Sequence, residues 1–137
     1  MDCCDFEEAA GRQFTEQLAR RELARYRTKG PGKTARLLCE TATAAGPIDG
    51  TLLEIGIGIG ALTFALLERA ITRAIAVDAS AAYLAAASEE AARRGLSDAI
   101  QFVHGDFLTI ASRIPSATIV VLDRVVCCYP TWEPLVG

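Results

Sequence analysis

Apolar and polar positions along the chain follow two different periods. Over residues 6–28, apolar side chains recur every three or four positions among charged ones, which predicts an amphipathic helix. A second helix is expected to start near Pro31 and to run to about residue 45, where a Gly-Pro pair stops it. The sequence therefore predicts an N-terminal helical segment, residues 1–46, that contains two helices.

From residue 51 onward, short apolar runs alternate with stretches of helical period. Strands are expected at 51–55, 73–78, 100–103 and 118–122, and helices at 60–69 and 80–94. Ser80 is the expected N-cap of the second of these helices, and Gly95 its C-terminal stop. This alternation predicts an α/β protein: a single domain, residues 1–137, with a Rossmann-like, doubly wound parallel sheet that has helices on both faces.

Composition narrows the choice of partners. The chain has 137 residues and a net charge of −3, with a pI of about 5.2, so it lacks the basic field that nucleic acids or anionic membranes attract. Its apolar runs are shorter than the roughly 20 residues that a membrane span needs. The acidic N-terminus does not resemble a signal peptide. We expect a cytoplasmic protein that binds neither nucleic acid nor membrane.

The five cysteines include two adjacent pairs, Cys3-Cys4 and Cys127-Cys128. Neither pair has the C-x-x-C spacing of common zinc and redox sites, and in a reducing compartment they are expected to be thiols. A metal site that joins the two pairs is the less favoured alternative. We expect no metal.

The segment from Leu52 to Gly60 carries the clearest chemical signal. An apolar run ends in Glu54, and Gly56, Gly58 and Gly60 follow at alternate positions before a helical stretch. Strand, glycine turn and helix in this order are typical of a loop that cradles a nucleotide, because glycines permit unusual dihedral angles and close approach of a ligand.

Glu54 helps to choose between two ligands for this loop. A dinucleotide would place its anionic pyrophosphate at the helix N-terminus, where a nearby carboxylate would repel it. The same carboxylate suits the cationic amino acid head of S-adenosyl-L-methionine (SAM). The glycines alone do not decide, because the dinucleotide pattern G-x-G-x-x-G/A also fits Gly56, Gly58 and Ala61. SAM is favoured over NAD.

Asp78 ends the second predicted strand, beside the glycine loop. An Asp at this position can accept hydrogen bonds from both ribose hydroxyls, which both SAM and NAD carry. The alternative role is to cap the helix over 80–94. We expect Asp78→Ala to weaken SAM binding and to change the stability of the unliganded fold little.

The loop resembles the E/D-x-G-x-G-x-G motif of class I SAM-dependent methyltransferases. That resemblance implies that Glu54, the three glycines and Asp78 bind the cofactor, and that Asp106 of the Gly105-Asp106 pair accepts from the adenine amino group. Asp123 follows the fourth predicted strand and is expected at the same edge of the sheet, near the methionine head or the reacting methyl. The catalytic base is unknown; Asp123, His104 and Tyr129 are its candidates.

The resemblance extends over the whole chain. The segment 123–130, the early Cys3-Cys4 pair and the Tyr-Arg-x-x-Gly-Pro sequence at 26–31 are similar to small bacterial class I enzymes, some akin to magnesium-protoporphyrin O-methyltransferases. Such proteins continue through three more strands. The expected sheet here has the order 3-2-1-4 with the later strands missing, as in a C-terminally truncated or split enzyme. Strand 118–122 would then expose an edge that favours self-association.

We therefore expect a SAM-dependent methyltransferase that acts on an unidentified, small-molecule acceptor and is catalytically incomplete as this chain alone. Two alternatives stay open. One is an NAD-dependent oxidoreductase, and the other is a non-catalytic fragment that only binds SAM.

Overall fold

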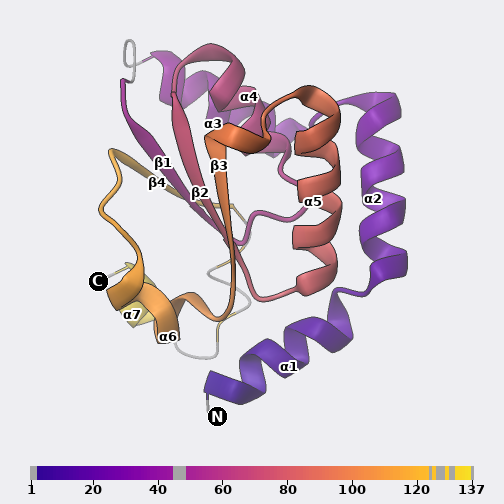
Figure 1. Cartoon of the computed structure of the whole chain (residues 1–137), viewed down its shortest axis with the longest axis vertical. Coiled ribbons are helices and arrows are strands. Elements are labelled where there is room, and N and C mark those ends of the chain that lie inside the picture. The colour runs from indigo at the N-terminus through magenta and orange to yellow at the C-terminus, as the bar shows by residue number, and fades with distance from the viewer. Residues whose placement is uncertain (1–2, 45–48, 124, 126–128, 130–131, 137) are drawn as a thin grey trace.

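The computed structural model describes residues 3–44, 49–123, 125, 129 and 132–136. Its centre is a parallel sheet of four strands in the order β3-β2-β1-β4 (Figure 1). The strands are β1 (Thr51–Ile55), β2 (Arg73–Asp78), β3 (Ile100–His104) and β4 (Ile119–Leu122). The predicted fold class and strand order are confirmed, and each strand lies within one residue of its predicted bounds.

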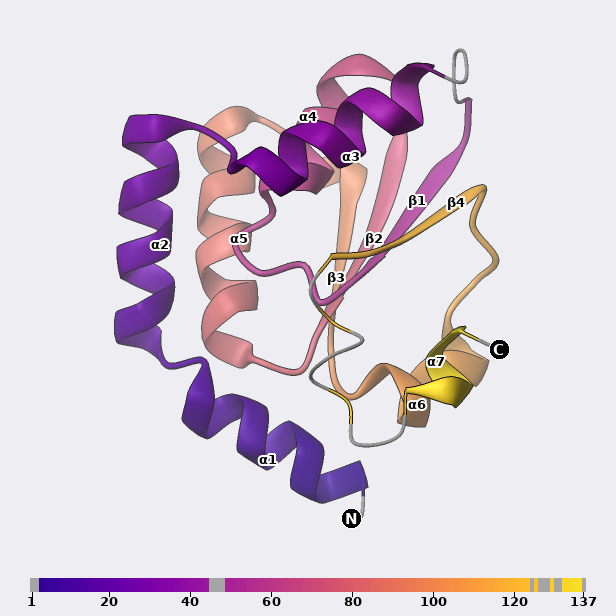
Figure 2. The ribbon, with the colours of Figure 1, turned by 180° about the vertical axis from the view of Figure 1, so that it is seen from behind.

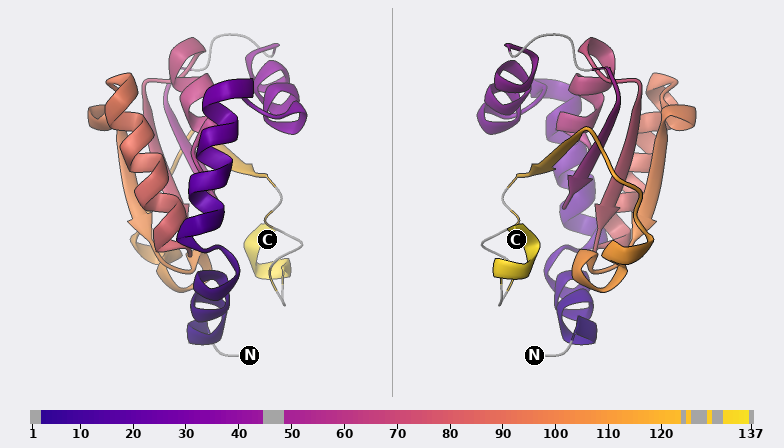
Figure 3. Two further views of the ribbon diagram at one scale, coloured as in Figure 1. Left: turned by 90° about the vertical axis from the view of Figure 1, so that its right-hand side faces the viewer. Right: turned by 90° about the vertical axis from the view of Figure 1, so that its left-hand side faces the viewer.

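The two faces of the sheet bury alternate residues of each strand, as the period of two in a strand requires. Leu52, Ala74 and Ala76 pack against the helices α4 (Ala61–Arg69) and α5 (Ala81–Arg94). Leu53, Ile55, Ile75 and Val77 form the core on the other face, where the short helices α6 (Phe107–Ile110) and α7 (Glu133–Val136) lie. Figure 3 shows the thick helical layer on one side of the sheet and the thin cover on the other.

The caps predicted for α5 are confirmed. The Ser80 hydroxyl accepts from the Tyr83 amide at 3.2 Å, and Gly95 ends the helix in the left-handed conformation, with φ of 72°. Short 3-10 turns, η1 (Ser97–Ala99) and η2 (Ala111–Arg113), flank β3 and α6. These local signals fix where α5 starts and where β2 must end.

The single helix predicted over 6–28 is wrong, because the chain forms two helices there. They are α1 (Cys3–Gln13) and α2 (Glu16–Lys29), so that with α3 (Lys33–Ala44) three helices precede the sheet. The break lies at Phe14 and Thr15: Thr15 is extended and its side chain accepts from the Leu18 amide, which starts α2. The Ser80 hydroxyl, in turn, donates to the Phe14 carbonyl at 2.9 Å and holds the break against α5.

The helical layer is arranged in pairs, α2 beside α5 and α3 beside α4, and α1 lies across the end of the sheet where the strands finish (Figures 1 and 2). An ionic network joins α2 to α5. Glu90 is fully buried and accepts from Arg27, Arg93 and Arg94 at 2.7–3.0 Å. These arginines hold the pKa of Glu90 at about 2, the Arg93 hydrogen bond contributing most.

β4 pairs with β1 alone among the described strands, and Val120 on it is 53% exposed. The structure thus leaves one side of β4 without a described neighbour. In the part of the chain that is described, no helix combines the length and the apolar composition that crossing a membrane requires. The predicted Gly-Pro stop after α3 and the Cys127-Cys128 pair lie outside the described residues.

Candidate functional site

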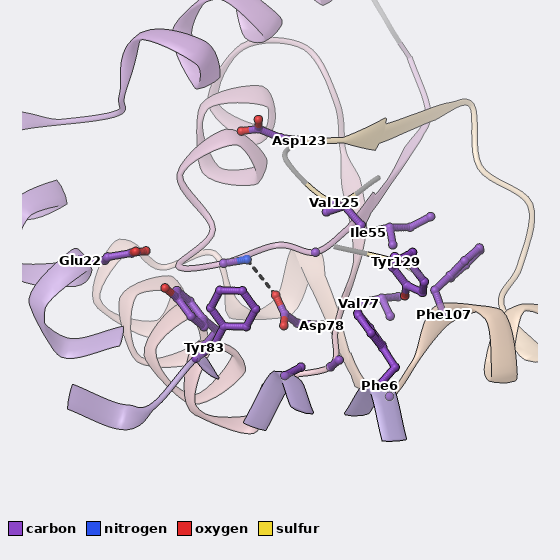
Figure 4. Close-up of a pocket in the computed structure, with 16 residues that line it drawn as sticks. Phe6, Glu22, Ile55, Val77, Asp78, Tyr83, Phe107, Asp123, Val125 and Tyr129 are labelled. Atoms are coloured by element: carbon purple, nitrogen blue, oxygen red, sulfur yellow. Dashed lines mark hydrogen bonds between the residues drawn. The ribbon is translucent and has the colours of Figure 1, made fainter. Parts of the chain in front are cut away.

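The carboxyl ends of the parallel strands bring the sequence-predicted residues to one edge of the sheet. The glycine loop follows β1, Asp78 ends β2, and Asp123 follows β4 (Figure 4). In open parallel sheets this edge is where ligands bind, at the point where the chain switches direction between strands. Here that point lies between β1 and β4.

The three glycines of the loop all have positive φ, of 75°, 58° and 93° for Gly56, Gly58 and Gly60. The space around them differs. A Cβ on Gly56 would lie 2.1 Å from a methyl of Val125, and one on Gly60 would lie 2.7 Å from the Phe64 ring. At Gly58 the nearest atoms, on the Tyr83 ring, would be 3.9 Å away. Gly56 and Gly60 are therefore required by packing, whereas Gly58 borders open space in the pocket.

Asp78 connects the glycine loop to the start of α5. One carboxylate oxygen, Oδ2, accepts from the Gly58 amide at 3.0 Å, and Oδ1 accepts from the Ser80 amide at 2.8 Å. Burial raises the pKa of Asp78, and these two hydrogen bonds oppose that rise. The side chain lines a pocket and also organises the backbone at the N-terminus of α5, and its role in binding ribose stays a prediction.

Glu54 lies beneath the loop and is 2% exposed. Its carboxyl accepts from the Thr63 hydroxyl in the first turn of α4. Burial raises its pKa from 4.5 to about 8; the charges of Asp123 and Asp78 add to the rise, and the hydrogen bond from Thr63 opposes it. The carboxyl of Glu54 is therefore held next to the first turn of α4, the helix whose N-terminus would receive the pyrophosphate of a dinucleotide.

A pocket of about 260 Å³ opens at this edge, and we call it the strand-end pocket. Asp78 and the loop form one side. Phe6, Phe107 and Tyr129 gather at one end of it, and Tyr83 stands at the other (Figure 4). Its lining combines apolar rings with few polar groups, which is typical of sites for small molecules and cofactors.

Apart from Tyr129, a candidate base, the sequence did not single out the aromatic side chains that line this pocket. Phe6 and Phe14 come from α1 and the break after it, and they contact Tyr129 and Tyr83 with ring centroids 4.2 Å and 5.6 Å apart. Helical periodicity places both phenylalanines on the apolar face of a helix, and both are partly buried, but periodicity does not show what that face covers. The Thr15 cap signal in the sequence could have revealed the break that turns α1 over the strand ends.

Asp106 is 3% exposed and serves as the N-cap of α6, accepting from the Leu108 amide at 3.1 Å. The Tyr129 side chain lies beside this carboxylate. Its neighbours Gly105 and Phe107 line the strand-end pocket. The role of Asp106 in binding adenine stays a prediction.

The three candidate bases lie in different surroundings. His104 is 44% exposed, and its Nε2 lies 3.0 Å from the Ala79 carbonyl and 3.6 Å from a Glu7 carboxylate oxygen. Burial and the adjacent Asp106 raise the pKa of Tyr129. Asp123 lies apart from Asp78, across the loop (Figure 4), and lines both the strand-end pocket and a second one.

The second pocket, about 670 Å³ in volume, lies between the glycine loop and the corner where α2 passes into α3, and we call it the corner pocket. Its lining includes Glu54, Asp123 and four basic side chains of α2 and α3. The corner pocket shares Glu22, Gly56, Gly58 and Asp123 with the strand-end pocket. The loop therefore separates two neighbouring binding spaces.

No group of three metal-ligating side chains occurs among the described residues. Cys39 is a buried free thiol. Because Cys127 and Cys128 lie outside the described part of the chain, the expectation that no metal is bound stays a prediction.

The sheet order, the glycine turn and Asp78 define a Rossmann-like nucleotide-binding domain. The chain belongs to the methyltransferase domain family, whose model, described as "Methyltransferase domain", matches residues 52–135. The matched segment contains all the predicted cofactor-binding residues. No curated protein sequence matches the chain.

Solved structures support this membership. A protein from Methanococcus maripaludis assigned as a SAM-dependent methyltransferase is 27% identical, with a TM-score of 0.70 over 85% of this chain and 53% of that one. A SAM-dependent methyltransferase from Geobacter sulfurreducens, in complex with S-adenosyl-L-homocysteine (SAH), is 22% identical, with a TM-score of 0.55 over 72% and 38% of the two chains. TrmK from M. capricolum, also with SAH, is 16% identical, with a TM-score of 0.57 over 67% and 40%.

The last two structures show likeness of fold. The chain spans 53% or less of the length of each of these three structures. The predicted resemblance to class I SAM-dependent methyltransferases is confirmed. The finer likeness to magnesium-protoporphyrin O-methyltransferases stays a prediction.

Proposed function

We propose that this chain binds SAM in the strand-end pocket and supports methyl transfer to a small-molecule acceptor. The observation that carries the proposal is the pair of acidic groups placed around the glycine loop. Asp78 lines the pocket while hydrogen-bonded to the Gly58 amide at 3.0 Å, and Glu54 sits at the first turn of α4. The first suits ribose, and the second disfavours a pyrophosphate.

The chemistry of the residues present suits the separate parts of SAM. Asp78 would accept from the ribose hydroxyls, and the apolar space between Phe107 and Tyr129 would take the adenine. Glu54 and Asp123, on the other side of Gly56, would attract the ammonium group. A cation beside Glu54 favours its ionised form, so we expect ligand binding to lower the pKa of this carboxyl from about 8.

SAM supplies an activated methyl group on a sulfonium. The contribution of the chain is to hold the reacting groups in line and to exclude water, which accounts for large rate effects in reactions of two bound molecules. Asp123 lines both pockets, so it is the best placed of the candidate bases to receive a proton from an acceptor. A base within hydrogen-bond reach of the acceptor would assist only where the acceptor atom carries a proton.

The NAD alternative is separated from SAM by titration calorimetry of the chain with SAH, SAM and NAD. We expect SAH and SAM to bind, and NAD to bind at least about tenfold more weakly because the acidic Glu54 lies beneath the loop that would receive the pyrophosphate. Glu54→Leu should weaken SAH binding. Equal affinity for NAD and SAH, or no binding of SAH, would overturn the proposal.

Methyl transfer itself is tested with isotopically labelled SAM and a panel of small acceptors. Transfer of label to any of them by wild type, but not by Asp78→Ala, would support activity. Binding of SAH without transfer to any acceptor would favour the non-catalytic SAM-binding alternative.

A further inference from the structure

The corner pocket gathers four cationic side chains on one wall. Arg25 and Lys29 come from α2, and Lys33 and Arg36 come from α3. All four are exposed to solvent. The wall is basic although the chain as a whole carries a net charge of −3. We call these four residues the basic wall.

None of the four has a carboxylate within 4.0 Å among the described residues. The contrast is with the neighbouring surface of the same helix, where Arg20 and Arg27 pair with Glu89 and Glu90. Like charges that converge on one hollow repel one another and concentrate anions from solution. The wall is therefore suited to bind an anion.

Two of the three described acidic groups that line the corner pocket, Glu54 and Asp123, belong to other elements, whereas Glu22 lies on α2 itself. Glu54 is hydrogen-bonded to Thr63, and Glu22 lies beside the Tyr83 side chain. Asp123 follows β4. The pocket thus has a side formed by α2 and α3, with four basic residues and the acidic Glu22, and an acidic side formed by the strand ends and the glycine loop.

We propose that the basic wall binds the anionic group, a carboxylate or a phosphate, of the methyl acceptor. The inference rests on the proposed function and adds the class of substrate. Since the two pockets meet at Gly56, Gly58 and Asp123, an acceptor held by its anionic group in the corner pocket would adjoin the cofactor in the strand-end pocket. That is the arrangement that direct transfer between two bound molecules needs.

The cofactor alone does not account for the wall, because SAM carries one carboxylate and the wall has four cations. A small molecule fits better than a nucleic acid. The cations line one hollow of about 670 Å³, within the range of small-molecule sites, and the chain has a pI of about 5.2.

The test uses the full chain saturated with SAH and titrates it with citrate, pyrophosphate and a short single-stranded RNA at low salt. The variant Arg25→Gln removes one charge from the wall. Arg113→Gln is the matched control, because Arg113 is exposed on η2 and is not among the residues that line either pocket. Arg25→Lys keeps the charge.

We expect wild type to bind citrate or pyrophosphate, and Arg25→Gln to bind it about fivefold more weakly, the effect of one lost charge contact. Arg113→Gln and Arg25→Lys should stay within about twofold of wild type. The affinity for SAH should be the same in all four proteins. Tighter binding of citrate would identify a carboxylate as the preferred group, and tighter binding of pyrophosphate would identify a phosphate.

Three results would overturn the inference. They are no binding of either small anion, a parallel loss of SAH affinity in Arg25→Gln, and RNA binding that depends on Arg25 while the small anions fail. Failure of the proposed function looks different. In that case SAH itself does not bind, whereas the effect of Arg25→Gln on anion binding can still be measured.

Discussion

Replacing Asp78 with alanine should weaken the fold as well as cofactor binding. Its two carboxylate oxygens accept from the Gly58 amide at 3.0 Å and the Ser80 amide at 2.8 Å. A hydrogen bond to a charged group contributes about 1.5–3 kcal/mol. Because the Asp78 side chain is only partly buried, we take the lower end for each bond, which gives a loss of about 3 kcal/mol. The sequence had suggested little change in stability.

The variant Asp78→Asn separates the two roles. Its amide oxygen can still accept from one of the two backbone donors, so its stability should fall between wild type and Asp78→Ala. It lacks the second acceptor oxygen, so it should bind SAH almost as weakly as alanine does. A loss of about 1–3 kcal/mol in binding corresponds to roughly five- to 150-fold in affinity.

Urea unfolding followed by circular dichroism measures the first effect, and calorimetry with SAH measures the second. The reasoning predicts a lower urea midpoint with an unchanged slope for Asp78→Ala. If Asp78→Ala unfolds at the wild-type midpoint, its two hydrogen bonds do not organise the loop. If it binds SAH with wild-type affinity, the ribose role is refuted.

Three further predictions concern single positions. Gly58→Ala should still fold, because its Cβ would meet only Tyr83 at 3.9 Å, but the positive φ of 58° should lower the free energy of unfolding by about 1 kcal/mol. Calorimetry should show that its affinity for SAH is reduced by about tenfold or more. Wild-type affinity in this variant would show that the glycine loop is not part of the binding site. Glu54 takes up a proton on folding, because its folded pKa of about 8 exceeds the ordinary 4.5, so the stability of the unliganded chain should fall as pH rises between these values. Urea midpoints across that range should be less pH-dependent in Glu54→Gln than in wild type; equal slopes would contradict the buried neutral carboxyl. If the wild-type chain self-associates through β4, sedimentation at high protein concentration should show less association for Val120→Lys. A wild-type chain that stays monomeric would show that the exposed edge of β4 does not drive association.

Local patterns were sufficient to predict most of the fold. The strand bounds and both caps of α5 follow from apolar runs and from Ser80 and Gly95, whose effects depend on near neighbours only. The break at Thr15 was missed because Phe14 keeps the apolar period while its partner, Tyr83, is remote in sequence. The period of apolar residues in a sequence predicts that a residue faces other protein atoms, but it does not show which element packs against it.

The site was predictable to the extent that the sheet edge determines it. Gly56, Gly58, Asp78 and Asp123 lie around the pocket because they follow parallel strands. The reason for each glycine was not accessible from the sequence, since the contact of Gly56 with Val125 joins segments far apart in the chain. The basic wall was not recognised either, because its residues lie on two helices and look like an ordinary solvated face until the corner after Lys29 brings them together.

The ionic network around Glu90 has a mechanical consequence. It clamps α2 to α5, and these two helices carry Arg25 on the corner pocket and Tyr83 on the strand-end pocket. We expect the two helices to move as one rigid body, so that a displacement of Arg25 in the corner pocket is accompanied by a displacement of Tyr83 in the strand-end pocket. The described residues of α1 take no part in this network, and Phe6 of α1 stacks on Tyr129, so we expect any adjustment that admits a ligand to the strand-end pocket to occur in α1.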